Sequence, residues 1–288
     1  MSTILDREQW PARERAHEAR IDDLTRGHRE RAGRGEPHPV EDFLFHYYRN
    51  PLGHLRRWHP GARFVLAGAE ERAGRRFYRM DDDAHLGVDV ASFAAEREGV
   101  IARARLVLAR TASRSAQLAC FGLHEWAMVY RAGERPEAVR HPWPLRLGVG
   151  GTEDVVESHT IRCTHYDAYR FFTEPAAPRN TVTPTRERQP ALEQPGCLHA
   201  GMDLYRWAFK LVPVVPSELV ADCFDLARRI RVLDMRASPY DLRDLGYEPV
   251  AIETPTGKAV YVAAQREFAA EGAGLRARLL AELDHAGL

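Results

Sequence analysis

The stretch that decides the fold runs from Ser217 to Arg236 and reads SELVADCFDLARRIRVLDMR. Its apolar side chains recur at helical spacing while charged side chains occupy the other positions. The residues expected to face inward are Leu219, Val220, Phe224, Leu226 and Ile230. This periodicity predicts an amphipathic helix with Ser217 as its N-cap. Such a helix must bury its apolar face against other elements, so a packed core is expected around it.

Four more long segments carry a helical pattern, and they lie on both sides of this stretch. They are residues 88–110, 113–131, 197–211 and 258–286. Short alternating segments between them are expected to be strands: 63–67 and 75–80 as a hairpin, 159–163, and 249–253. The pattern therefore predicts a mainly α fold, a single compact multi-helix domain with a few short β-strands.

The chain shows no internal repeat and no clean break in composition. Residues 1–35 are expected to form a charged N-terminal helix or arm, and residues 36–288 a single helical domain. Residues 175–195 form a Pro/Arg/Thr-rich connection in that domain, and such a long connection in a compact domain is usually functional or mobile.

The composition is that of an ordinary globular protein, with 288 residues and 44% hydrophobic side chains. No apolar run is long enough to span a membrane, and the N-terminus is charged throughout, so a cytoplasmic protein is expected. The 41 basic and 41 acidic side chains cancel, which removes a bulk electrostatic argument for nucleic-acid binding. The four cysteines are far apart and predict neither a disulfide framework nor a zinc knuckle.

The densest group of polar functional side chains lies between Ser158 and Arg170. It contains His159, Arg162, Cys163, His165, Tyr166, Asp167 and Arg170. A helix is expected over 165–172, which would place Asp167 in its first turn, where the helix dipole favours a carboxylate. The segment is therefore interpreted either as the lining of a site or as a capped helix start.

A second candidate is His124-Glu125-Trp126, inside an otherwise apolar segment. Buried charges need partners, so His124 and Glu125 form either a satisfied core pair or an acid–base or metal-binding pair. The zinc-protease pattern HExxH is absent.

Two further groups of charged residues follow helical patterns, and both are expected to form salt-bridged surface networks. They are His199, Asp203 and Arg206, and Asp234, Arg236 and Asp241.

Aromatic and cationic side chains also alternate at 46–48 and 56–59, a mixture that suits base stacking and phosphate binding but also an ordinary helix–loop corner. The sequence contains no P-loop, no GxGxxG turn, no GxSxG elbow and no EF-hand. His159-x-x-x-Cys163 resembles the covalent haem attachment of a small group of bacterial aromatic hydroxylases.

Five segments resemble an actinobacterial family whose members usually carry the label "3-methyladenine DNA glycosylase". They are PVEDFLFHYY from Pro39, LRRWHPG from Leu55, FGLHEWAM from Phe121, residues 159–172, and DMRASPYDL from Asp234. The resemblance covers nearly the whole chain. It implies a DNA repair N-glycosylase that excises alkylated purines from damaged DNA without a cofactor.

A glycosylase must extrude the damaged base, stack it and place a carboxylate or activated water at the sugar. In that interpretation, Asp167 or Glu125 would position the water, with His124 as a third catalytic candidate. The side chains expected to stack the base are His46, Tyr48, Trp58 and Tyr166. The arginines expected to hold phosphates are Arg57, Arg162 and Arg170.

Two alternatives remain open. One is an oxygenase that binds haem or non-haem iron through His124, His159 or His165 and acts on a small aromatic substrate. The other is a non-catalytic binding protein whose histidines and arginines are structural. Bound iron distinguishes the oxygenase from both other interpretations.

Overall fold

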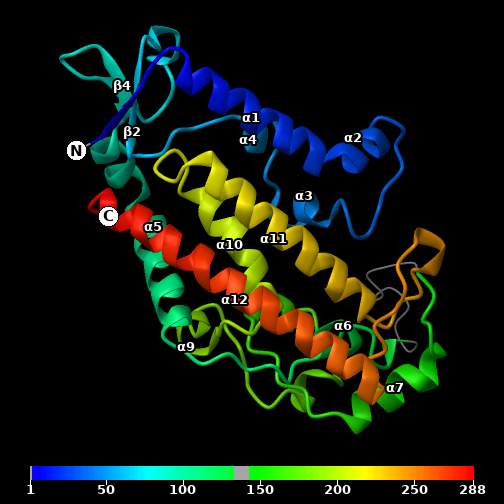
Figure 1. Cartoon of the computed structure of the whole chain (residues 1–288). Helices are drawn as coiled ribbons and strands as arrows, with labels where there is room; N and C mark the ends of the chain where they lie inside the picture. The colour runs from blue at the N-terminus through cyan, green and yellow to red at the C-terminus, as the bar shows by residue number, and fades with distance from the viewer. Residues whose placement is uncertain (1, 133–142) are drawn as a thin grey trace. The chain divides into compact units, whose positions relative to one another are not determined.

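Helices dominate the computed structural model, which describes residues 2–132 and 143–288 (Figure 1). Helix accounts for 56% of the chain and strand for 6%, which confirms the mainly α fold class with a few short strands. The chain divides into two compact units. Unit 1 comprises Met1–Ala109, Met202–Arg228 and Ala273–Leu288, and unit 2 comprises Arg110–Gly201 and Arg229–Gly272. The expected division into an arm at 1–35 and a domain at 36–288 stays a prediction.

Five α-helices precede residue 113 in the described chain. They are α1 (Gln9–Leu24), α2 (Arg26–Ala32), α3 (Phe43–Tyr48), α4 (Leu52–Arg56) and α5 (Val90–Ala112). Helix α5 lies close to the segment predicted at 88–110. Figure 1 shows α1 beside α4. The imidazole of His17 on α1 is buried there, with Nε2 2.9 Å from the carbonyl oxygen of Leu55.

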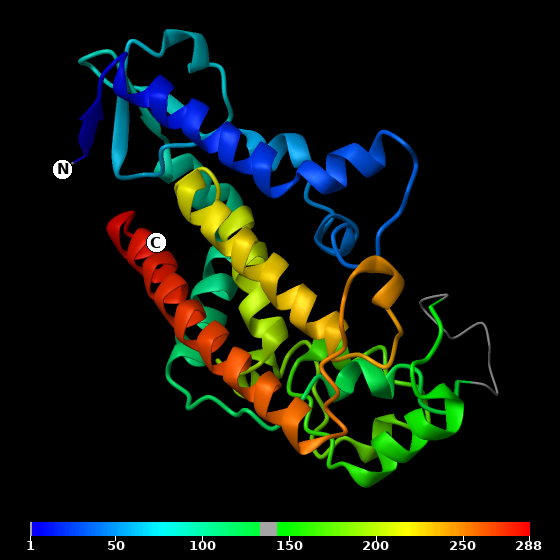
Figure 2. The ribbon, with the colours of Figure 1, turned by 45° about the vertical axis from the view of Figure 1, so that its right-hand side comes forward.

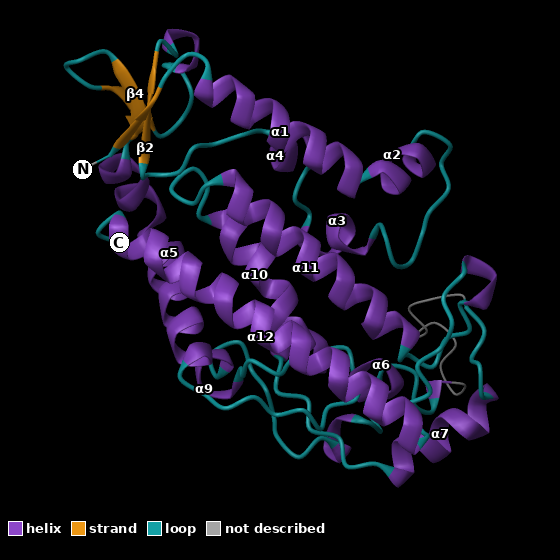
Figure 3. Ribbon diagram, viewed as in Figure 1, coloured by secondary structure: helices purple, strands orange, loops and turns teal. Residues whose placement is uncertain are grey.

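A four-stranded sheet in unit 1 has the order β1-β2-β4-β3 (Figure 3). The strands are β1 (Thr3–Leu5), β2 (Phe64–Ala67), β3 (Tyr78–Met80) and β4 (His85–Val88), and a 3₁₀ turn η1 (Glu70–Arg72) follows β2. The predicted hairpin between 63–67 and 75–80 is wrong, because β2 and β3 both pair with β4 instead. Gly87 of β4 pairs with Val65, whose Cγ1 would lie 3.0 Å from a Cβ at that position, so a larger residue there would crowd the Val65 side chain.

An apolar cluster fills the space between this sheet and the start of α1. Its buried members include Leu5, Trp10, Trp58, Leu66 and Leu86. Figure 2 shows the first strand at the edge of the sheet, next to the beginning of α1. The cluster holds Trp58 and the residues beside it in a fixed position in unit 1.

Unit 2 contains shorter helices and more irregular backbone. Its short elements are α6 (Leu123–Ala127), α7 (Gly148–Ser158), α8 (Tyr166–Tyr169), η4 (Ala177–Arg179), α9 (Gln189–Leu192) and η5 (Arg243–Leu245). The predicted long helix at 113–131 is wrong. Phe121 and Gly122 adopt left-handed φ values of 47° and 69°, which interrupt the helical backbone just before α6.

Three other expectations for unit 2 also need correction. The helix expected over 165–172 is confined to α8. The strand expected at 159–163 is a single bridge between Ile161 and Asn180, and 249–253 forms no strand. The short elements η4 and α9 lie within the connection at 175–195.

Besides α5, whose last residues belong to unit 2, three helices contribute residues to both units: α10 (Leu198–Lys210), α11 (Ser217–Arg236) and α12 (Pro255–His285). Their bounds agree with the predicted ones within a few residues, and those of α11 are identical. The Ser217 hydroxyl accepts a hydrogen bond from the His59 amide and donates one to the Arg57 carbonyl. Ser217 is thus the first residue of α11 and holds the loop after α4, and the carbonyl of Pro216 before it accepts the first amides of the helix.

Candidate functional site

Three side chains from separate elements of unit 2 meet in its interior. His124 lies on α6, His199 lies near the start of α10, and Asp234 lies near the end of α11. One potential ligand atom from each lies within 4.8 Å of the others, and all three residues are buried. Two imidazoles and one carboxylate are thus gathered at one point, and we call this set the His/Asp triad.

The backbone before α6 positions His124. Gly122 adopts its left-handed φ with Tyr261 against it, since a Cβ there would lie 3.5 Å from the Tyr261 ring. This turn starts α6 beneath α11, and the ring of His124 reaches the carboxylate: Nε2 donates to Asp234 Oδ1 at 2.9 Å. The ring of His199 packs edge-on against that of His124, with 4.5 Å between the centroids.

The second oxygen of Asp234 is held by an arginine. Arg231, one turn earlier on α11 and 1% exposed, donates from one guanidinium nitrogen to Asp234 Oδ2 and to Glu125 Oε1, both at 2.8 Å. Both oxygens of Asp234 therefore have donors, and Glu125 lies one residue from His124 on the same short helix. Arg231 links two buried acidic residues and supplies the counter-charge of Glu125.

These contacts shift the protonation of the triad. Burial opposes the charged ring of His124, but the charge and hydrogen bond of Asp234 outweigh it and raise the pKa of His124 well above its ordinary value. Burial likewise opposes the charged carboxylate, but His124 and Arg231 hold the pKa of Asp234 far below its usual range. Without a metal ion, His124 and Asp234 form an ion pair. Arg231 and Glu125 add one further positive and one further negative charge to it.

A further histidine and carboxylate adjoin the triad. The ring of His165 stacks on that of His199, with 5.2 Å between the centroids and 27° between the planes. Its Nε2 lies 3.6 Å from Glu193 Oε2. Thr111 and Gln189 donate to the carboxylate of Glu193 at 3.1 and 2.7 Å. An imidazole nitrogen and a carboxylate oxygen, the same kinds of potential ligand atom, are therefore also present next to the triad.

Three thiols surround this region as free cysteines. Cys120 Sγ lies 3.9 Å from His124 Nδ1, on the side of the ring away from Asp234. Burial raises the pKa of Cys163 and that of Cys197, so both are neutral thiols at neutral pH. None of the three belongs to the triad, whose potential ligand atoms are nitrogen and oxygen.

The three histidines proposed as ligands from the sequence have different positions. His124 belongs to the triad and His165 adjoins it. His159 does not join them: its Nδ1 lies 2.7 Å from the Val155 carbonyl oxygen, at the end of α7. The His159/Cys163 pattern that resembles a haem attachment therefore does not gather its histidine with His124 and His199.

Two members of the triad were expected on the surface, and that expectation is wrong. His199 is 6% exposed and Asp234 is 0% exposed. Asp203 is buried too, although its expected ion pair with Arg206 is present at 3.3 Å. The register of α11 already contained the signal, because Asp234 follows the inward-facing Ile230 by four residues.

The residues expected to serve a glycosylase are distributed over both units. In unit 2, Asp167 pairs with Arg170 at 3.2 Å, Arg186 lies over the ring of Tyr166 at 5.7 Å, and Arg162 is exposed.

In unit 1, His46 is exposed, and Tyr48 donates to Asp203 Oδ1 at 2.8 Å. Trp58 is fully buried and donates to Glu218 at 2.9 Å, so its ring has no exposed face. Arg57 lies beside a cavity in this unit.

Comparisons with known proteins add no relative: no family model, no curated protein and no solved structure matches the chain. Within residues 2–132 and 143–288, no helix has the length and apolar character needed to cross a membrane.

Proposed function

We propose that this chain is a metal-dependent oxidoreductase with a non-haem iron centre on His124, His199 and Asp234. The observation that carries the proposal is the buried convergence of two imidazoles and one carboxylate from three helices. A set of two histidines and one carboxylate is typical of Fe(II) oxygenases, because three protein ligands leave coordination positions for oxygen and substrate.

Two imidazoles and one carboxylate suit Fe(II), and the same ligand types also hold catalytic zinc. Thiolates select the softer metals, whereas imidazole and carboxylate also suit iron. Three thiols lie in this part of unit 2, yet the triad gathers nitrogen and oxygen. Bound there, iron would supply the redox chemistry of oxygen activation.

The surrounding side chains would prepare the ligands for that ion. Arg231 fixes Asp234 through the oxygen that His124 does not use, and Glu125 fixes Arg231 in turn. Such outer partners orient metal ligands and tune their basicity. His165, stacked on His199 and close to Glu193, is a group that can carry a proton beside the centre.

The test is metal content after anaerobic reconstitution with Fe(II) and desalting. We expect one iron per chain in the wild type and loss of that iron in His199→Asn. His159→Asn, in the same unit but outside the triad, is the matched control and should retain it. Circular dichroism would establish that both variants are folded.

Nitric oxide gives the identity of the centre, since it binds open positions on non-haem Fe(II) and yields a characteristic paramagnetic resonance signal. A folded wild type without iron, or equal iron in His199→Asn, would overturn the proposal. A Soret band would replace it with haem, and stoichiometric zinc would replace it with hydrolytic chemistry.

A DNA N-glycosylase is the second candidate, and the observation that favours it is the surface around α8. This helix places Tyr166, Asp167 and Arg170 within five residues, which supplies a ring, a carboxylate and a cation close together. An excision assay on methylated DNA tests it: activity in metal-free protein, abolished in Asp167→Asn, would support the glycosylase and contradict the iron enzyme.

A further inference from the structure

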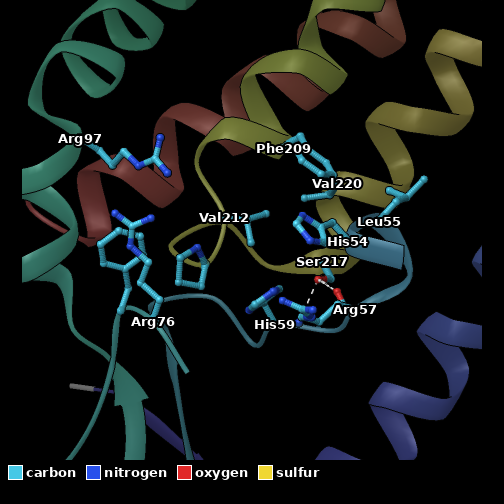
Figure 4. A pocket seen from close by; sticks show the side chains of 12 residues that line it. His54, Leu55, Arg57, His59, Arg76, Arg97, Phe209, Val212, Ser217 and Val220 are labelled. Atoms are coloured by element: carbon cyan, nitrogen blue, oxygen red, sulfur yellow. Dashed lines mark hydrogen bonds between the residues drawn. The ribbon is translucent and has the colours of Figure 1, made fainter. Parts of the chain in front are cut away.

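A cavity of about 230 Å³ in unit 1 has a strongly cationic lining (Figure 4). The loop after α4, the turn before β3, helix α5 and the segment between α10 and α11 form its walls. Its basic side chains are His54, Arg57, His59, Arg76 and Arg97, and none of the described residues that line it is acidic.

The positive charge of this lining is only partly neutralised. Arg76 pairs with Glu96, which lies outside the lining. No ion pair joins Arg57 or Arg97 to an acid in the part of the chain that the structure describes. Figure 4 shows Arg76 and Arg97 at one end of the cavity and Arg57 at the other, so cations flank it on two sides.

The pKa of His59 is lowered in part by the same positive charges. Burial and, after it, the charges of Arg75, Arg57 and Arg72 lower the pKa of His59 to about 3. Burial and the neighbouring Arg72 also lower the pKa of Arg75. Cations are thus crowded here at a cost that a bound anion would relieve.

The remaining wall is apolar and rigidly placed. Phe77 and Phe209 contribute rings, and Val212 and Val220 contribute aliphatic groups. The Ser217 hydroxyl fixes the backbone of the cationic wall through its bonds to Arg57 and His59 at 3.2 and 2.9 Å. The cavity is smaller than the roughly 300 Å³ at which sites for larger ligands begin, so its ligand must be small.

We propose that this cavity is a binding site for a small aromatic phosphate monoester, with the phosphate at the end where Arg76 and Arg97 lie and the ring against the apolar wall to which Phe209 and Val212 belong. Arginine suits phosphate because its planar fork donates two parallel hydrogen bonds to two oxygens. A single ring with one phosphate matches both the charge and the size of the cavity. This inference is independent of the metal centre.

Calorimetric titration of the full chain with phenyl phosphate tests the site, with phenol and inorganic phosphate as partial probes. We expect phenyl phosphate to bind more tightly than either part, and Arg97→Gln to weaken it on the order of tenfold or more. Arg79→Gln, an exposed arginine on β3, is the control and should bind unchanged.

Three results would contradict the proposal. Absence of phenyl phosphate binding to the folded wild type would overturn the proposal, as would equal affinity in Arg97→Gln and the wild type. Tighter binding of a single-stranded hexanucleotide than of phenyl phosphate, weakened equally in Arg79→Gln, would replace the cavity with an extended nucleic-acid surface.

Discussion

Replacing Arg231 by methionine tests whether the charges around the triad act as one network. Arg231 is 1% exposed and holds Glu125 and Asp234 at 2.8 Å each. Asp234 keeps His124 when the guanidinium is removed, whereas Glu125 loses the only ion-pair partner that it has among the described residues. Breaking a buried pair from one side typically costs 3–5 kcal/mol, so we expect Arg231→Met to lower the free energy of unfolding by about 4 kcal/mol.

The assay is urea denaturation at neutral pH, with a second substitution that removes the orphaned charge. Because Gln at position 125 carries no charge, Glu125→Gln combined with Arg231→Met should be more stable than Arg231→Met alone, by about 1–2 kcal/mol. Arg229→Met, two residues away with a half-exposed pair to Glu271, should cost less than about 1 kcal/mol. A loss below about 1 kcal/mol in Arg231→Met, or no recovery in the double variant, would refute the network.

Three further predictions concern single positions. Gly257→Ala would place a Cβ 1.9 Å from the Ala251 carbonyl oxygen and should lower the free energy of unfolding by about 2–3 kcal/mol. Gly274 lies in the same helix with open space around it, so Gly274→Ala should raise the free energy of unfolding by about 0.5–1 kcal/mol. Similar values for the two variants would contradict this prediction. Asn180→Ala removes three hydrogen bonds to the backbone around Cys163 and Val182 and should cost about 3 kcal/mol by the same urea assay; a loss under about 1 kcal/mol would contradict that packing. Burial and nearby arginines lower the pKa of His59 from 6.5 to about 3, so the neutral ring stabilises the folded protein above pH 6.5 and this stabilisation is lost as the pH falls. Unfolding curves should show a loss of about 2 kcal/mol in the free energy of unfolding by pH 5. The His59→Asn variant should lose less stability over the same pH range.

The long helices could be predicted from the sequence because their periodicity is local. Helix α11 has an apolar stripe that fixes both its type and its length, and its observed bounds are the predicted ones. The segment before α6 could not be predicted in the same way. Its apolar spacing also fits a helix, but the left-handed turn at Phe121 and Gly122 packs against Tyr261, which is more than a hundred residues later in the chain. A tertiary contact of this kind overrides local propensity.

Part of the candidate site could also be predicted from local sequence. His124 and Glu125 drew notice because charged groups inside an apolar segment must have partners. The sequence could not say which partners, since they lie on α10 and α11, among other charged residues that fit a surface network equally well. Only the packing of the helices shows that Asp234 points inward while its neighbour Arg236 bonds to the backbone of Glu248 near the surface.

The burial of this network is itself an argument for function. A well-packed apolar core is often as stable as a buried ion-pair network, because desolvating the charges offsets much of their attraction. The four charged side chains and the His199 ring inside unit 2 therefore add little stability beyond what Leu or Met side chains would provide. Their arrangement is explained better by a ligand that needs them. His124, His199 and Asp234 would hold a divalent ion in place of the proton that His124 and Asp234 share, and Arg231 would orient the carboxylate through its other oxygen.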